Sequence, residues 1–82
     1  MSITLTTAQI RGARAMLGWT AADLANQSGV AVSTIRRIEV QTGQPDCHQR
    51  TVMDIQRAFE AAGIEFLGTP ENGPGVRMTN KS

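Results

Sequence analysis

The sequence predicts a mainly α-helical domain followed by a short β-hairpin. Through about the first three quarters of the 82 residues, apolar side chains recur at helical spacing, and capping residues and glycines bound each run. After Gly63 the pattern changes to short β-type segments. Because roughly 100–200 residues is the usual size of a domain, we expect one small domain of four helices and a hairpin.

The composition is that of an ordinary globular protein and excludes several classes. Hydrophobic residues make up 40% of the chain, charged residues 18%, and the net charge is +1, which is far from a non-specific nucleic-acid coat. No apolar run approaches the roughly 18 residues that span a bilayer, and no secretion signal opens the sequence. A single cysteine and a single histidine supply neither an internal disulfide nor a usual metal site. We expect a cytoplasmic protein without a metal or other cofactor.

The first helix is marked at both ends. Thr6 is placed as an N-cap with Gln9 three residues later, the pattern of a capping box, and Gly18 ends the helix. Its inward face repeats at helical spacing and consists of Ile10, Ala13, Arg14 and Leu17.

The second helix repeats this pattern immediately. Thr20 is its expected N-cap, Asp23 follows three residues later, and Gly29 is its stop. Trp19 precedes the cap and is expected to cover Leu24 as a hydrophobic staple rather than to serve as a stacking platform.

The third helix is expected over residues 32–40, with Ile35 and Ile38 inward. Its N-cap position is Ala31, which has no side-chain acceptor. Since a missing cap costs about 0.5–2 kcal/mol, packing has to hold this helix.

The last helix and the hairpin complete the predicted elements. Asp46 and Gln49 form a further capping box, so the fourth helix should run from there to about residue 62. Residues 64–67 and 76–78 are strand-like, and the prolines and glycines between them predict a long loop. The expected buried face of the fourth helix is Val52, Ile55, Phe59 and Ala62.

Residues 20–40 have the spacing of a helix-turn-helix. Two short helices meet through a turn that contains Gly29, where a positive φ is needed, and the small Ala25 lies where the helices cross. An ordinary αα-hairpin in a small bundle is the alternative. The apolar contacts between the two helices are expected from Leu24, Val30, Ile35 and Ile38.

The third helix places polar side chains opposite its inward face. An arginine can grip guanine O6 and N7 through two parallel hydrogen bonds, a serine can bond several base edges, and a valine can contact a thymine methyl. Alternatively, the two arginines solvate an exposed face or reach phosphates. The candidate base contacts are Val32, Ser33, Arg36 and Arg37.

Phosphate contacts are expected at the N-terminal end of the second helix and at the loop after the third helix. Thr20 caps the second helix, whose free N–H groups can also bind a phosphate. A plain solvated loop is the alternative for Gln41, Thr42 and Gln44, and His48 is expected at the surface. The candidate phosphate contacts are Thr20, Thr34, Gln41, Thr42 and Gln44.

About residues 5–66 resemble the phage-repressor/Cro-type (XRE-like) helix-turn-helix domains. The most specific stretch is Gly29-Val30-Ala31-Val32-Ser33-Thr34-Ile35-Arg36-Arg37-Ile38-Glu39. The resemblance implies a compact, four- to five-helix, lambda-repressor-like DNA-binding domain, usually dimeric, that represses or regulates transcription. It also implies an ion pair between Arg14 and Glu39, in preference to a DNA contact by Arg14. Ala21 stands where many relatives carry a polar DNA contact, so no contact is assigned there.

These features together predict a sequence-specific double-stranded DNA-binding protein, a small transcriptional regulator that acts as a repressor. An enzyme is not expected, because the chain has no phosphate-binding glycine loop, nucleophile elbow or metal-ligand cluster. The alternative is an antitoxin that binds both operator DNA and a protein toxin.

The expected organisation divides the chain into two overlapping parts. Residues 1–67 should form the DNA-binding domain, with the recognition helix at residues 32–40, and residues 64–82 should form the hairpin and tail. We expect a homodimer on a palindromic operator, joined at exposed strand edges in residues 64–67 and 76–78. The same region is the expected contact for a toxin or other partner.

Overall fold

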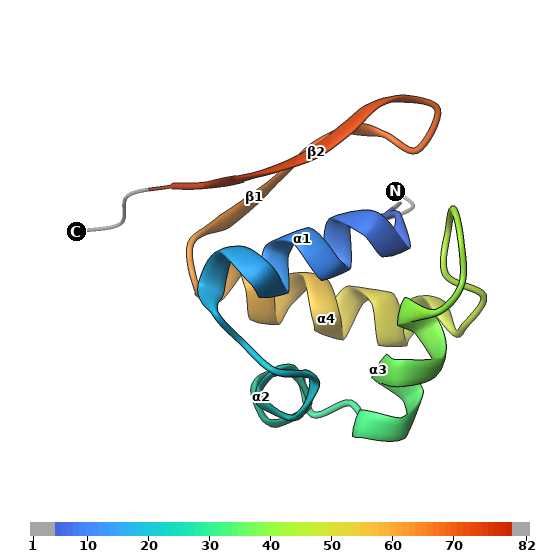
Figure 1. Ribbon diagram of the computed structural model, residues 1–82, viewed down its shortest axis with the longest axis vertical. Coiled ribbons are helices and arrows are strands. Elements are labelled where there is room, and N and C mark those ends of the chain that lie inside the picture. Colours follow the sequence, from blue (N-terminus) through green and yellow to red (C-terminus); the bar gives the residue numbers. More distant parts are fainter. Residues whose placement is uncertain (1–4, 80–82) are drawn as a thin grey trace.

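The computed structural model describes residues 5–79 and contains four helices and one two-stranded antiparallel sheet in that range (Figure 1). This confirms the predicted mainly helical fold with a hairpin near the C-terminus, with the smaller of the two expected helix counts. The elements are α1 (Thr7–Leu17), α2 (Ala21–Ser28), α3 (Val32–Glu39), α4 (Gln49–Ala61), β1 (Ile64–Thr69) and β2 (Asn72–Met78).

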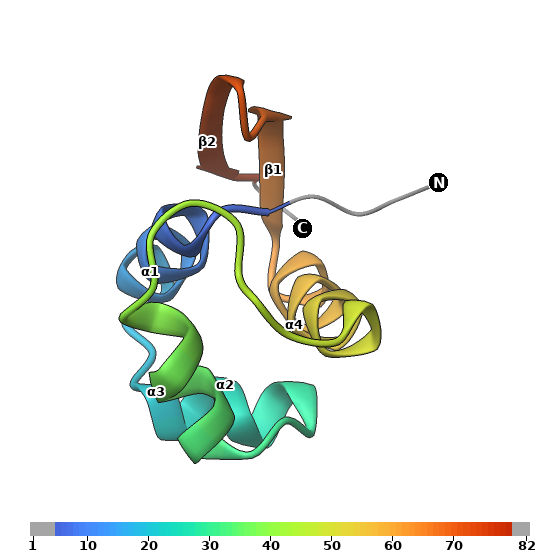
Figure 2. The ribbon, with the colours of Figure 1, turned by 90° about the vertical axis from the view of Figure 1, so that its right-hand side faces the viewer.

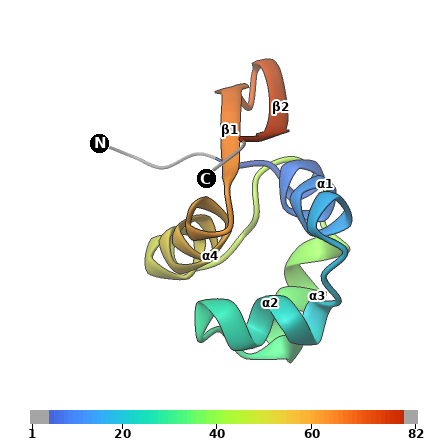
Figure 3. The same ribbon diagram turned by 90° about the vertical axis from the view of Figure 1, so that its left-hand side faces the viewer.

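Helices α1 and α4 form a central layer with different elements on its two sides (Figures 1 and 2). The hairpin lies on one side, where β2 packs on α1 and β1 packs on α4. Helices α2 and α3 lie on the other side, where α2 packs on α4 and α3 packs on α1 (Figure 3). None of the described helices has the length and the apolar character needed to cross a membrane.

The core is centred on Phe59, which is fully buried. Trp19 stacks on its ring at a centroid distance of 5.6 Å, and Phe66 meets it edge-on at 5.9 Å. The stack between Trp19 and Phe59 joins the start of α2 to α4, a contact that the sequence pattern did not predict. The buried apolar residues are Leu5, Ile10, Ala13, Leu24, Ile35, Ile38, Val52, Ile55, Ala58, Phe59 and Ile64.

The predicted ends of the first two helices are confirmed. The side chains of Thr6 and Thr20 accept the N–H groups of Gln9 and Asp23, and both capping boxes are complete. The C-cap glycine of α2, Gly29, has φ of 76°, which explains why a glycine ends this helix. Helix α3 begins without a side-chain cap, as the alanine at its N-cap position predicts.

The predicted start of α4 is wrong. The helix begins at Gln49 with His48 as its N-cap, and no side chain caps it. The backbone N–H of Asp46 instead donates to the Gln41 side-chain oxygen at 2.7 Å. Asp46 therefore belongs to the preceding loop, where the hydrogen bond from its N–H fixes the turn. At the other end of α4, the predicted burial of Ala62 is replaced by that of Ala58.

The long loop predicted between the strands is also wrong. Pairing continues to Thr69 and Asn72, so the connection is a tight turn. Gly68 has φ of 72° and lies at the irregularity between the paired stretches, which is where a β-bulge takes a glycine. Pro74 is tolerated because each strand of a two-stranded sheet has a free edge. These residue types indicate a loop in sequence, yet here they bend a continuous hairpin.

Candidate nucleic-acid interface

Helix α3 has one buried face and one face of exposed polar side chains. Ile35 and Ile38 are buried almost completely, while Ser33, Arg36 and Arg37 are exposed. Within residues 5–79 the structure gives these three polar side chains no hydrogen bond and no ion pair. Each therefore keeps its full set of donors and acceptors for a ligand.

The two remaining candidates on α3 are less exposed. Val32 is half-buried and lines a shallow cleft with residues of α2, among them Ala22 and Ala25. Thr34 is also half-buried and faces the start of α4, across a groove that Arg37 borders as well. Of the residues assigned to α3 from the sequence, Ser33, Arg36 and Arg37 are thus the most accessible.

The groove between α3 and the start of α4 contains groups of both charges. Arg37 contributes from α3, and Asp46, Cys47 and His48 contribute from the α4 end. Burial raises the pKa of the Cys47 thiol, and the nearby positive charge of Arg37 lowers it in part. The thiol therefore keeps its proton more firmly than a solvated cysteine does.

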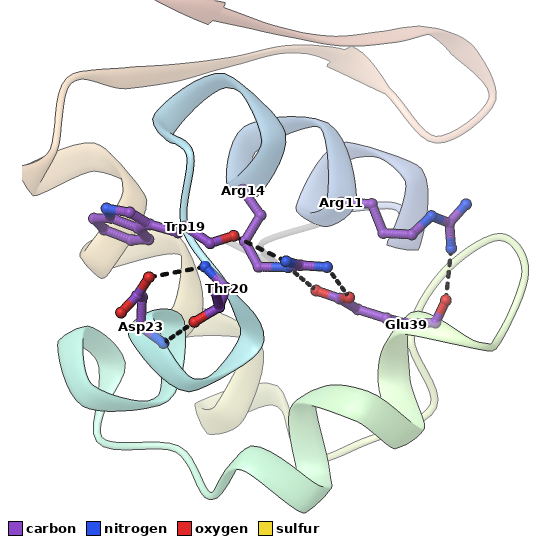
Figure 4. A network of polar contacts seen from close by, with 6 residues as sticks. All are labelled: Arg11, Arg14, Trp19, Thr20, Asp23 and Glu39. Carbon is purple, nitrogen blue, oxygen red and sulfur yellow. Dashed lines mark hydrogen bonds and ion pairs between the residues drawn. The ribbon is translucent and has the colours of Figure 1, made fainter.

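Arg14 connects α1 to the segment before α2 and to the C-terminal end of α3 (Figure 4). Its Nε and Nη2 donate to the two carboxylate oxygens of Glu39 at 2.8 and 2.7 Å, and its Nη1 donates to the Trp19 carbonyl at 2.9 Å. The hydrogen bond with Glu39 raises the pKa of Arg14 despite the opposing effect of burial. The ion pair expected from the family resemblance is present, and every guanidinium nitrogen of Arg14 is engaged within the protein.

Two further turns of α1 hold the end of α3 and the loop that follows it. Arg11 donates from Nη1 to the Glu39 backbone carbonyl at 2.6 Å (Figure 4). Thr7 donates its backbone N–H to Gly43 at 2.8 Å and its hydroxyl to the Gln41 carbonyl at 2.9 Å. Successive residues of Thr7, Arg11 and Arg14 lie about one turn apart on one side of α1, so this side of α1 orients α3 and the loop that follows it.

The sequence reasoning missed Thr7 and Arg11. Thr7 lies four residues before Arg11, and Arg11 lies three residues before Arg14. This spacing places all three side chains on one face of the helix, which is the signal that could have identified them.

The predicted phosphate contacts outside α3 fall into two groups. The Thr20 hydroxyl accepts the Asp23 N–H at 3.0 Å, and Thr20 is exposed at the start of α2. In the loop, Thr42 and Gln44 are exposed, whereas Gln41 is half-buried and its side-chain oxygen accepts the Asp46 N–H. Thr20 and the loop are presented by different elements on either side of α3.

Residues 10–46 match a family model described as helix-turn-helix. The matched range contains most of α1, all of α2 and α3, and the loop held by Thr7. The match identifies residues 10–46 as a helix-turn-helix of the phage-repressor/Cro type (XRE-like). No curated protein matches the sequence. The match supports a DNA-binding regulator of transcription, and α2 and α3 are the two helices of the matched helix-turn-helix.

Proposed function

We propose that the protein binds a specific double-stranded DNA sequence as a homodimer and represses transcription from it, in the cytoplasm and without a cofactor. The observation that carries this proposal is the exposed face of α3, where Ser33, Arg36 and Arg37 have no partner among residues 5–79. In a helix-turn-helix, the second helix enters the major groove and presents such side chains to base edges.

The roles on α3 follow from chemistry and position. With 100° between successive residues, Arg37 lies about 160° around the helix from Ile35 and about 100° from Ile38, on the exposed side of α3. We assign it the bidentate contact to a guanine, with Arg36 beside it. Ser33, near the N-terminal end, takes a further base edge, and Val32 takes a thymine methyl at the rim of the α2–α3 cleft.

Phosphate contacts on either side of α3 would fix its position in the groove. The start of α2, next to Thr20, offers backbone N–H groups and the positive end of the helix dipole. The loop after α3 offers polar side chains on the other side. We assign phosphate contacts to Thr20, Thr34, Gln41, Thr42 and Gln44.

A homodimer is proposed because the hairpin offers self-complementary features away from α3. Met78 is 44% exposed, and Glu65 and Arg77 provide one charge of each sign on the hairpin surface. The longest dimension of the protomer is 32 Å, close to the roughly 34 Å between half-sites one helical turn apart. Two copies joined through residues 64–67 and 76–78 can thus present both recognition helices to a palindrome.

Selection of bound duplexes from a random DNA pool tests the DNA-binding proposal. The wild-type protein should enrich a palindromic site, and affinity for it should fall steeply as salt rises. Arg37→Ala should relax base choice at one position of each half-site and cost about 1–3 kcal/mol. Arg57→Ala, an exposed arginine of α4, is the matched control and should leave base choice unchanged. Binding that ignores both sequence and salt would refute the proposal.

Sedimentation of the purified protein tests the homodimer, and Met78→Asp should weaken it by placing a charge in the contact. A monomer at high concentration would contradict this part of the proposal. Stoichiometric co-purification of a second protein bound to the hairpin would instead favour the antitoxin alternative.

Repression is tested with a reporter gene whose promoter overlaps the selected site. The wild-type protein should lower expression and Arg37→Ala should not, whereas activation by the wild-type protein would refute a repressor.

The division into a DNA-binding domain at residues 1–67 and a hairpin with tail at 64–82 stays a prediction, and its ends at residues 1–4 and 80–82 lie outside the described residues.

A further inference from the structure

We propose that Arg11 of α1 contacts a DNA phosphate beside the C-terminal end of the recognition helix. This inference rests on the proposed function, since it requires α3 to enter the major groove. It adds to the interface a residue that lies outside the helix-turn-helix itself. The argument combines the position of Arg11, its charge and the depth of the groove.

Arg11 is exposed, and its side chain is held at the end of α3. Its Nη1 donates to the carbonyl of Glu39, the last residue of that helix, at 2.6 Å. Figure 4 shows the side chain extending away from Arg14 toward the loop that follows α3. An arginine has five N–H donors, and within residues 5–79 this one bond is the whole of its polar contacts. The remaining donors are free for an anion.

The positive charge of Arg11 is not neutralised inside the described part of the chain. The carboxylate of Glu39, the residue whose backbone carbonyl Arg11 binds, is held by Arg14 through two hydrogen bonds of 2.8 and 2.7 Å. Arg77 on the hairpin has the opposite arrangement, because Glu65 neutralises it at 2.6 Å. Arg11 therefore presents a full charge on the surface next to the C-terminal end of α3.

The length of α3 places its C-terminal end at the level of the phosphates. From Ser33 to Glu39 the helix rises by about 9 Å, at roughly 1.5 Å per residue. The major groove is about 8.5 Å deep. When the N-terminal half of α3 reaches the base edges, the Glu39 carbonyl and the guanidinium bound to it are close to the rim of the groove.

Arg11 also continues the row of predicted phosphate contacts. One turn before it, Thr7 holds the loop that carries Thr42 and Gln44 through its bonds to Gly43 and to the Gln41 carbonyl. The same side of α1 thus supports the loop and carries the arginine. A single DNA strand that follows this rim meets the loop first and Arg11 next.

A purely structural role for Arg11, as a cap on the end of α3, is the competing explanation. The two roles differ in their salt dependence. Loss of a phosphate contact makes the slope of log K against log salt less steep by about 0.9 for each bound protomer. Loss of a cap lowers affinity by the same factor at every salt concentration and lowers the thermal midpoint.

The experiment measures the affinity of the wild-type protein, Arg11→Ala, Arg11→Lys and Arg57→Ala between about 50 and 200 mM salt. Two labelled probes are used, the duplex selected from the random pool and a mixed-sequence duplex of the same length. For Arg11→Ala, the loss of affinity over this range should be smaller than for wild type by a factor of about 3.5 per protomer, on both probes. Arg11→Lys should retain the wild-type slope, and so should Arg57→Ala.

The outcomes separate the two proposals. An Arg11→Ala slope equal to those of wild type and Arg57→Ala would overturn the phosphate contact alone, whatever the change in affinity. If the wild-type protein and Arg57→Ala both fail to bind either probe, the proposed function is overturned together with the contact. A less steep slope for Arg11→Ala, restored by Arg11→Lys, supports the contact, because a cap does not change the number of released counterions.

Discussion

The helix-turn-helix and the hairpin lie on opposite sides of the α1–α4 layer, and there is an arginine–glutamate pair on each side. On the helix-turn-helix side, Arg14 and Glu39 come from different helices, and their side chains are 24% and 10% exposed. On the hairpin, Arg77 and Glu65 come from paired positions of neighbouring strands and are 60% and 45% exposed. The first pair connects two elements, whereas the second connects residues that the sheet already holds together.

Helix α1 supports both sides with different residues. The side that carries Thr7, Arg11 and Arg14 binds α3 and its loop through charged and polar groups. On the side toward the hairpin, the Gln9 amide donates to the carbonyls of Leu67 and Gly75 at 3.2 and 2.9 Å. Gly12 faces Val76 there, and a Cβ on Gly12 would make an ordinary van der Waals contact with the Val76 side chain at 3.5 Å.

The two sides differ in the polar groups that they leave accessible to a ligand. The supporting contacts of α3 come from its inner face and its C-terminal end, so its outer arginines and serine stay without partners in residues 5–79. On the strands of the hairpin, the charges of Arg77 and Glu65 neutralise one another. A polar ligand therefore has more to bind on α3, while the hairpin suits a partner that buries neutral surface.

The largest effect is expected for Arg14→Ala. This substitution leaves the nearly buried Glu39 carboxylate without its partner and frees the Trp19 carbonyl. Removing one member of a buried pair typically costs about 3–5 kcal/mol, and because Arg14 is partly exposed we expect about 3 kcal/mol. Urea unfolding followed by circular dichroism measures it.

Arg77→Ala is the matched control for this prediction. It breaks a pair of the same residue types, in which Nε and Nη2 of Arg77 both donate to Oε1 of Glu65. Because this pair is exposed, the cost should be below about 1 kcal/mol. Equal losses of unfolding free energy for the two variants would mean that the pair of Arg14 and Glu39 stabilises the protein no more than the exposed pair on the hairpin does.

A smaller effect is expected for Gln9→Ala. The Gln9 side chain is buried and serves both the hairpin carbonyls and the N–H of Thr6. Losing these bonds should cost about 2 kcal/mol, because unsatisfied buried polar groups cost roughly 1–3 kcal/mol each and some become hydrated.

Hydrogen exchange locates the effect of Gln9→Ala. Amides of β1 and β2 should exchange faster, while those of α3 should keep their protection. Gln56→Ala, which removes an amide that donates to Glu60 on α4, should leave the hairpin unchanged. Faster exchange throughout α3 in Gln9→Ala would show that the two sides are not supported independently.

The predictable part of the fold was the part determined locally. Thr6 and Thr20 cap helices through residues three positions away, and Gly29 ends α2 through its own φ. The start of α4 was misassigned because the N–H of Asp46 is captured by Gln41, five residues earlier, across a loop. The lengths of the two strands were underestimated because Gly68 forms a bulge only in the context of its partner strand.

The candidate site follows the same division. The face of α3 that carries Ser33, Arg36 and Arg37 follows from helical periodicity, and the burial of the opposite face confirms that orientation. The pair of Arg14 and Glu39 came from the family resemblance and not from spacing. The contacts of Arg11 with α3 depend on how α1 crosses it, which no local pattern encodes, and the base and phosphate contacts stay predictions.

The smallest effect, and a gain, is expected for Ala31→Ser. Ala31 is exposed and occupies the N-cap of α3 with φ of −60° and ψ of 139°, a conformation that serine adopts readily. A serine hydroxyl there can accept the N–H of Ser33 or Thr34 and should stabilise the protein by about 1 kcal/mol. Ala22→Ser, also exposed but inside α2, is the control and should be neutral or slightly destabilising. Because α3 is already held at its other end by Arg11 and Arg14, the gain measures how much of its first turn frays in the native state. No gain in the unfolding midpoint would mean that the contacts with α1 and the core already order the whole helix. The polar contacts between α1 and α3 would then stabilise α3 more than the pair of Arg14 and Glu39 alone suggests.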